Sequence, residues 1–369
     1  MKLTAHLNEL DASDAAAFRK LAERLRSVPD REPSADLADR ILAAVDAERG
    51  RSRRRTPAPW WGVAAAALLV AALSLFSVFR QGRTCGASAE DGLAWLAAAQ
   101  EPDGTWSPAK YGGSEAYRPA LTALSALALA RGTEERYAPH LKRACAALAS
   151  LQTADGAFGG QSRERLYNHA LTTFALATLY SGQPALKPVL ARAIAFSRAQ
   201  QTAEGGWDYE PRSEGNAALT AWQVRALACA GRNGFGEAAV PLRKGLRWLR
   251  GSTREDGSVA YHRESFSRSD SLTALAAYTL ITAGDAFPGL PALGRHVAGT
   301  LSAAPASEEV ADCYRDYVKA LAFESAGSGA QAAAVRQQMV ARQKAGRRDQ
   351  WQSVGGRLYT TALTQLAAR

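Results

Sequence analysis

The chain has 369 residues, with 45 Lys or Arg against 35 Asp or Glu and a net charge of +10. Its apolar fraction of 47% excludes a wholly disordered protein. The four cysteines stand far apart and form no C-x-x-C pair, which argues against a zinc knuckle, a thioredoxin-type redox site and a dense disulfide framework.

The first 59 residues predict two short helices. Apolar side chains recur at helical spacing over residues 4–26, and Ser34 is a suitable N-cap for a second helix that ends near Glu48. Two helices of this length cannot bury a core of their own. The segment is therefore expected either to dock on a partner or to serve as a plain solvated anchor.

A membrane span is predicted over Trp60–Phe79, because these 20 residues carry no charge and match the thickness of a hydrocarbon core. Two tryptophans open the span, and an arginine-rich run precedes it at residues 49–55. The positive-inside rule places residues 1–59 in the cytoplasm and residues 80–369 outside, as a periplasmic domain. The expected localisation is the inner (cytoplasmic) membrane, crossed once.

Most of the positive excess lies beyond the span. Residues 1–59 are almost balanced, whereas residues 80–369 carry a net charge of about +8. That charge is spread along the sequence without a basic stripe, so nucleic acid is not expected as a partner. The layout of residues 1–80, with short helices, an arginine run and a span, resembles membrane-bound anti-sigma factors. This resemblance implies a sigma factor as a cytoplasmic regulatory partner, although the family's zinc-binding His/Cys set is missing here.

A repeat of about fifty residues dominates the rest of the chain. The pattern Q-x-x-D/E-G-x-W/F occurs three times, and a degenerate fourth copy occupies residues 253–259. The repeat side chains are Gln100, Trp106, Gln152, Phe158, Gln201 and Trp207. A Leu-Thr pair follows each copy at similar spacing.

Each repeat predicts a helical hairpin. The stretch before the motif is amphipathic, the D-G or E-G pair supplies a turn with positive φ, and the following stretch is apolar nearly all round. The second helix of each pair is therefore expected inside and the first outside. A fifth pair is predicted near 290–303 and 308–326, and a sixth near 328–344 and 356–369. Six such hairpins predict an all-α fold, an α/α toroid over residues 80–369.

These repeats resemble the QW motifs of the terpenoid cyclase and protein prenyltransferase superfamily, and above all the bacterial prenyltransferase/squalene oxidase repeat proteins. The resemblance covers residues 88–369. It implies that the repeat Gln and aromatic side chains tie outer helices together and act structurally.

The inner-helix N-termini should surround one mouth of the ring, where polar and aromatic residues gather. A polar mouth over an apolar pit suits a ligand with a polar group and an apolar body, but Asn, Ser and Asp are also common helix caps. The candidate ligand-binding residues are Tyr117, Arg118, Tyr167, Asn168, His169, Asn216, Asp270, Tyr314, Arg315, Tyr317 and Tyr359.

The catalytic and metal-binding motifs that the resemblance implies are not found in this sequence. The D-x-D-D acid motif of squalene-type cyclases and the DDxxD magnesium motif are absent. The Asp-x-Cys zinc pair of protein prenyltransferases has only adjacent Asp312 and Cys313 as a counterpart, with His169 or His262 as a third ligand. Weak acid candidates are Asp270, Asp312 and Asp316, and no cofactor is expected.

The leading hypothesis is a membrane-anchored toroid that binds an apolar, isoprenoid-like ligand or a protein. One alternative is an enzyme that acts on a terpenoid or a lipid-linked isoprenoid, with tyrosines stabilising a carbocation by cation–π contact. Another is an envelope scaffold.

Overall fold

The computed structural model describes residues 89–132, 135–160, 162–209, 214–263, 269–284, 288–299, 310–346 and 349–368. The chain divides into two compact units, residues 1–81 and 82–369, and all described residues belong to the second. The predicted span at 60–79 and the N-terminal helices lie outside them. Within the described part, no helix combines the length and the apolar character that a bilayer crossing requires.

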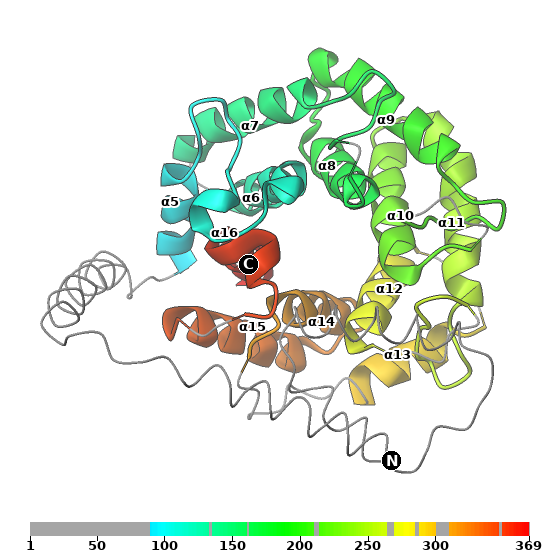
Figure 1. Cartoon of the computed structure of the whole chain (residues 1–369). Coiled ribbons are helices and arrows are strands. Elements are labelled where there is room, and N and C mark those ends of the chain that lie inside the picture. Colours follow the sequence, from blue (N-terminus) through cyan, green and yellow to red (C-terminus); the bar gives the residue numbers. More distant parts are fainter. Residues whose placement is uncertain are drawn as a thin grey trace, which may run out of the picture. The chain divides into compact units, whose positions relative to one another are not determined.

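The second unit is a double ring of helices (Figure 1), as an α/α toroid requires. The outer helices are α5 (Ala89–Ala98), α7 (Ala138–Ser150), α9 (Lys187–Ala199), α11 (Ala239–Gly251), α13 (Leu290–Gly299) and α15 (Gly329–Lys344). The inner helices are α6 (Arg118–Ala130), α8 (Arg165–Leu179), α10 (Ala217–Arg232), α12 (Asp270–Thr282), α14 (Cys313–Ser325) and α16 (Gln352–Ala368). Short 3-10 turns precede several of them.

The predicted outside–inside alternation is confirmed, and the described residues contain no β-strand. Helix α14 begins later than predicted, because Asp312 caps it by accepting a hydrogen bond from the Arg315 amide at 2.9 Å. Helix α16 breaks at Gly356 (φ 56°, ψ −150°), where an added Cβ would lie 1.7 Å from the Tyr111 carbonyl oxygen. Only glycine allows this close approach of the chain to the first repeat.

The predicted positive-φ turn is present in every copy of the repeat. Gly104, Gly156, Gly205 and Gly257 have φ between 83° and 99°. An added Cβ at each would come within 2.8 Å of a carbonyl oxygen in the next outer helix. The glycine therefore serves twice, as a turn residue and as the point of contact between neighbouring outer helices.

The repeat glutamines connect consecutive outer helices. The side-chain amide of Gln201 donates to the Gly205 carbonyl within its own turn at 2.8 Å and to the Pro241 carbonyl of α11 at 2.9 Å. Gln100 and Gln152 make the same pair of bonds, to α7 and α9. Each glutamine amide thus joins the carbonyl of its own turn to a carbonyl in the first turn of the next outer helix.

The repeat tryptophans fix each loop to its own outer helix. Trp106 and Trp207 are fully buried and donate from the indole to carbonyls ten residues earlier, at 2.7 Å. The Leu-Thr pair completes the loop, because Thr122 and Thr220 accept hydrogen bonds from the backbone amides of these tryptophans. Phe158 takes the tryptophan's place in the second copy and is also fully buried.

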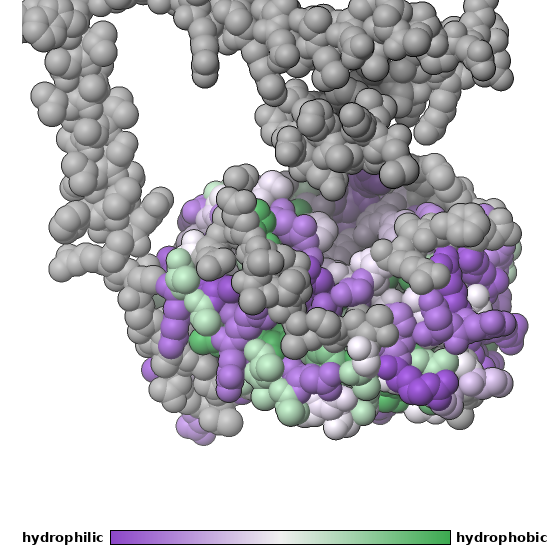
Figure 2. All heavy atoms as spheres, turned by 90° about the horizontal axis from the view of Figure 1, so that it is seen from below, coloured by the Kyte–Doolittle hydropathy of each residue, from purple (hydrophilic) through white to green (hydrophobic). Residues whose placement is uncertain are grey.

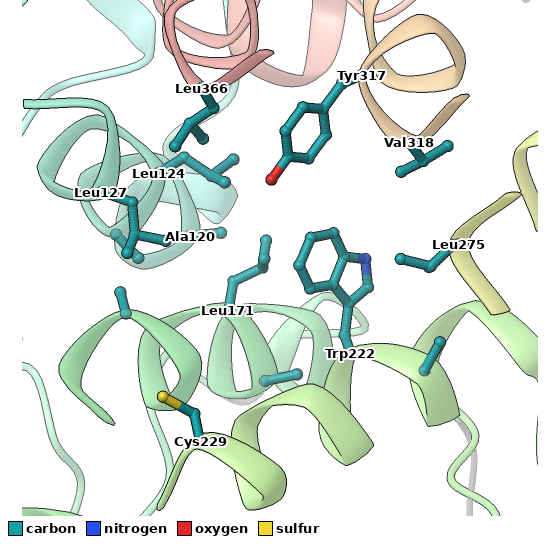
Figure 3. Packing of buried hydrophobic residues seen from close by; sticks show 14 of the residues in the cluster. Ala120, Leu124, Leu127, Leu171, Trp222, Cys229, Leu275, Tyr317, Val318 and Leu366 are labelled. Carbon is teal, nitrogen blue, oxygen red and sulfur yellow. The ribbon is translucent and has the colours of Figure 1, made fainter. Parts of the chain in front are cut away.

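The middle of the inner ring is packed with apolar side chains (Figure 3). Leu124, Leu171, Trp222 and Leu275 converge there from α6, α8, α10 and α12 and are at most 1% exposed. Tyr317 reaches in from α14 with its hydroxyl toward the centre (Figure 3). These side chains are part of the buried core.

The positive charge is not spread as evenly as the sequence suggests. Helices α7, α9, α11, α13 and α15 together contain 13 Lys or Arg and no Asp or Glu. Hydrophilic residues cover much of the side seen in Figure 2, with small apolar patches between them. The excess therefore lies on the outer helices, because the inner ones are buried.

Candidate functional site

Aromatic hydroxyls gather at the N-terminal ends of the inner helices. The tyrosine cluster consists of Tyr117, Tyr167, Tyr209, Tyr314 and Tyr359. Tyr117 and Tyr167 meet edge to face with ring centroids 6.2 Å apart, and Tyr167 hydrogen bonds Tyr359. Tyr314 and Tyr209 are close enough for each phenol to raise the pKa of its neighbours. The cluster therefore joins three inner helices and one repeat loop.

The cluster is enclosed but not sealed. Burial is the main cause that raises the pKa of Tyr167, Tyr209 and Tyr314. Each of these rings nevertheless keeps part of its surface accessible, whereas Tyr359 is only 3% exposed. Side chains that are surrounded by protein and still accessible line a recess, which is the geometry of a ligand site.

The floor of the cluster is formed by Trp222, Tyr317 and Arg225. The Trp222 indole donates to the Tyr314 hydroxyl at 3.1 Å. The Arg225 guanidinium lies 4.4–4.6 Å from the ring centroids of Phe174, Trp222 and Tyr278 and hydrogen bonds Tyr317. An arginine is thus held among aromatic rings at the base of the recess.

A group of buried acids borders the cluster at the start of α14. Asp349 accepts hydrogen bonds from the backbone amides of Cys313 and Trp351, at 2.8 and 2.9 Å. Asp312 accepts from the Trp351 indole at 2.8 Å, and the Trp351 ring meets that of Tyr314 with centroids 6.1 Å apart. Burial raises the pKa of the Asp349 carboxyl.

The three predicted acid candidates occupy different surroundings. Asp312 borders the cluster, and its charge raises the pKa of Tyr314. Asp316 is 1% exposed and pairs with Arg342 at 2.5 Å, and burial raises its pKa. Asp270 is half-exposed and pairs with Lys319 of α14 at 3.0 Å.

Four predicted mouth residues make contacts within the protein. Asn168 bonds the backbone at Ala116 and Ala120, and Asn216 caps α10. Arg118 pairs with Glu115 at 2.5 Å, and Arg315 lies 3.5 Å from Asp316. The Asn216 contact is the helix cap that the sequence offered as an alternative.

His169 lies between the rings of helices, with its imidazole 2.9 Å from the Ser197 hydroxyl of α9. It is fully buried against Phe158 and Phe196. Burial lowers its pKa to about 3, so it is neutral at ordinary pH.

The Asp312–Cys313 pair does not complete a metal site with the predicted histidines. Burial raises the pKa of the Cys313 thiol well above its usual range, and the neighbouring Asp349 adds to this. His262 lies 3.0 Å from the Gly215 carbonyl. Among the described residues, no three His, Cys, Asp or Glu side chains are placed to hold a metal ion.

Sequence reasoning missed Tyr209, Trp351, Asp349 and Arg225. The sequence contains a signal for two of these residues, Tyr209 and Arg225. Tyr209 and Tyr261 follow the repeat glycines by the same four residues, and Arg225 is a charge within an inner-helix stretch that is otherwise mostly apolar. Asp349 and Trp351 lie in the connection before α16, where the repeat pattern gives no alignment.

The sequence matches the model of one protein family. The prenyltransferase alpha-alpha toroid domain matches residues 28–181 and 171–283. The chain belongs to this family. Membership confirms the resemblance to the toroid superfamily that the repeats indicate.

Among curated proteins, a drimenyl diphosphate synthase of Streptomyces showdoensis is 34% identical over 150 residues. The match covers 40% of this chain and 27% of the synthase, so the chain spans about a quarter of that relative's length.

Solved structures show the same fold at low identity. The GH76A alpha-1,6-mannanase of Salegentibacter sp. HEL1_6 has a TM-score of 0.53 and 12% identity, covering 76% of this chain and 97% of the mannanase. An unsaturated glucuronyl hydrolase specific for heparin has the same TM-score and identity, with coverages of 75% and 92%. A protein from Actinoplanes also has a TM-score of 0.53, at 18% identity, covering 76% of this chain and 97% of that one. At these identities the likeness concerns the fold alone.

Proposed function

We propose that the tyrosine cluster binds an apolar, isoprenoid-like ligand. The observation that carries this proposal is the set of aromatic rings that are enclosed by the inner helices and yet partly accessible. Rings of this kind offer apolar faces to a ligand body, and their hydroxyls give orientation. The partial relative that makes drimenyl diphosphate supports an isoprenoid as the ligand class.

Titration of the purified full chain with farnesol tests the proposal. Tyr314→Ala removes a ring of the cluster, and we expect it to weaken farnesol binding by about tenfold or more. Tyr180→Ala is the matched control, because Tyr180 packs on Phe235 and not on the cluster. Equal affinities for all three proteins would contradict the proposal.

A second candidate is an enzyme that acts on a prenyl substrate, and Asp349 favours it. Its carboxyl has a pKa raised by burial, and it lies beside Trp351, which contacts the cluster. A carboxyl whose pKa is raised by burial beside aromatic rings is a candidate general acid for the protonation of an alkene. Incubation of the full chain with farnesyl diphosphate, followed by mass spectrometry, tests this. A product that the wild type forms and Asp349→Asn does not would establish the activity.

We also propose that residues 60–79 anchor this domain to the inner membrane from its periplasmic side, with residues 1–59 docking on a cytoplasmic regulator such as a sigma factor. The support is the uncharged 20-residue stretch and the preceding arginines. Membrane fractionation combined with protease protection tests the topology. Digestion of residues 82–369 from the cytoplasmic side would contradict it.

A further inference from the structure

Arg225 is a buried cation without a recorded counter-ion. It is 7% exposed, and no carboxylate among the described residues lies within ion-pair distance of it. Its Nη1 atom is buried and has no hydrogen-bond partner in the described part of the chain. Burying a charge in this way costs several kcal/mol unless a partner compensates it.

The surrounding groups compensate this charge only in part. Three aromatic rings on α8, α10 and α12 lie against the guanidinium, and each such contact offsets part of the cost of burying the charge. The Tyr317 hydroxyl from α14 supplies a neutral partner. Four inner helices thus hold one guanidinium at the floor of the tyrosine cluster with part of its hydrogen-bonding capacity unused.

We propose that Arg225 binds the carboxylate of an apolar ligand. A carboxylate carries one charge and accepts two parallel hydrogen bonds from a guanidinium. Burial raises the pKa of Tyr314 and Tyr317, and the nearby Arg225 charge opposes this rise in both, so the two hydroxyls would flank the same group. The inference rests on the proposed function, since it assigns the head group of the ligand that the tyrosine cluster holds.

A single guanidinium balances a ligand with one negative charge better than it balances a diphosphate. Arg163 and Arg131, two further cations whose charges reach these tyrosines, lie at the edges, because Arg163 is exposed over the Tyr209 ring and Arg131 is exposed at the C-cap of α6. A diphosphate at the floor would leave charge uncompensated among aromatic rings, which is unfavourable. The site therefore favours an acid over a diphosphate with the same apolar body.

Three ligands with one body and different head groups test this inference. Farnesol, farnesoic acid and farnesyl diphosphate are titrated calorimetrically against the full chain at neutral pH. We expect farnesoic acid to bind about tenfold or more tightly than farnesol. Arg225→Met should abolish that difference, while Arg232→Met, at the exposed end of α10, should keep it.

The outcomes separate the two proposals. If farnesol and farnesoic acid bind the wild type alike, or if Arg225→Met keeps the preference for the acid, the head-group inference fails and the proposed function stands. If farnesyl diphosphate binds more tightly than farnesoic acid and this binding depends on Arg225, the assignment of a singly charged head group is wrong. If none of the three binds, the proposed function fails as well. If Arg225→Met fails to fold, Arg225→Lys replaces it in the test, because lysine keeps the charge. Arg225→Lys should retain part of the preference for farnesoic acid over farnesol.

Discussion

The repeat loops and the tyrosine cluster are both built where the chain enters an inner helix, but they differ in how completely their polar groups are paired. In the loops, the Gln201 amide and the Trp207 indole donate to backbone carbonyls. In the cluster, the tyrosines remain partly accessible, and the Nη1 atom of Arg225 has no hydrogen-bond partner among the described residues. Complete pairing is typical of groups that hold a fold together, whereas incomplete pairing is typical of groups that meet a ligand.

This comparison predicts that loop substitutions reduce stability and that cluster substitutions reduce binding. The largest effect is expected for Trp207→Ala, because Trp207 is fully buried and its indole bonds the Ser197 carbonyl. The free energy of unfolding should fall by about 3–5 kcal/mol, measured by denaturant titration. A loss below about 1 kcal/mol would show that the loop does not hold the ring.

Gly205→Ala should cost about 2–3 kcal/mol. Its φ is +99°, and a Cβ would lie 2.8 Å from the Lys244 carbonyl oxygen. Gly234→Ala separates the two causes, since Gly234 has φ +87° with open space around it. Similar losses at both positions in the same denaturant titration would mean that backbone strain alone accounts for the effect and that contact with α11 contributes nothing.

Gln201→Ala should cost about 1–2 kcal/mol, because it leaves the Gly205 and Pro241 carbonyls without this donor. The measurement is again denaturant unfolding, with Gln183→Ala as control, since Gln183 is exposed and bonds within its own helix end. If the two substitutions cost the same, the link between α9 and α11 adds no stability.

We expect His169 to make the free energy of unfolding depend on pH, with a smaller effect than the substitutions above. Its pKa falls from 6.5 to about 3 on burial, so between these values the unfolded chain binds more protons and stability is lost as the pH drops below 6.5. The contribution is at most about 1.4 kcal/mol per pH unit. In His169→Phe, the slope of unfolding free energy between pH 4 and pH 6 should become flatter. An unchanged slope would exclude His169 as its source.

Much of the ring could be predicted from the sequence. The repeat glycines, the Leu-Thr pairs and the apolar stretches recur with one period, and periodicity reports on backbone geometry and burial directly. The later start of α14 could not be predicted, because the capping role of Asp312 depends on a hydrogen bond from the Arg315 amide that the sequence pattern does not signal.

The candidate site was predicted less well. Aligning the repeats located Tyr167, Tyr314 and Tyr359 at one end of the ring, but the direction of each side chain depends on packing that the alignment does not contain. His169 and Asn168 follow directly on Tyr167 and point to different partners. Asp349 meets Cys313 from 36 residues away, a contact for which the sequence gives no signal.

The most direct test of the central claim is a crystal structure of the full chain with farnesol bound. The account predicts electron density for the ligand among Tyr167, Tyr209 and Tyr314, above the Trp222 ring, with the repeat loops unchanged. Ligand density on the outer helices, or a fully occupied crystal in which these rings contact no ligand, would contradict it.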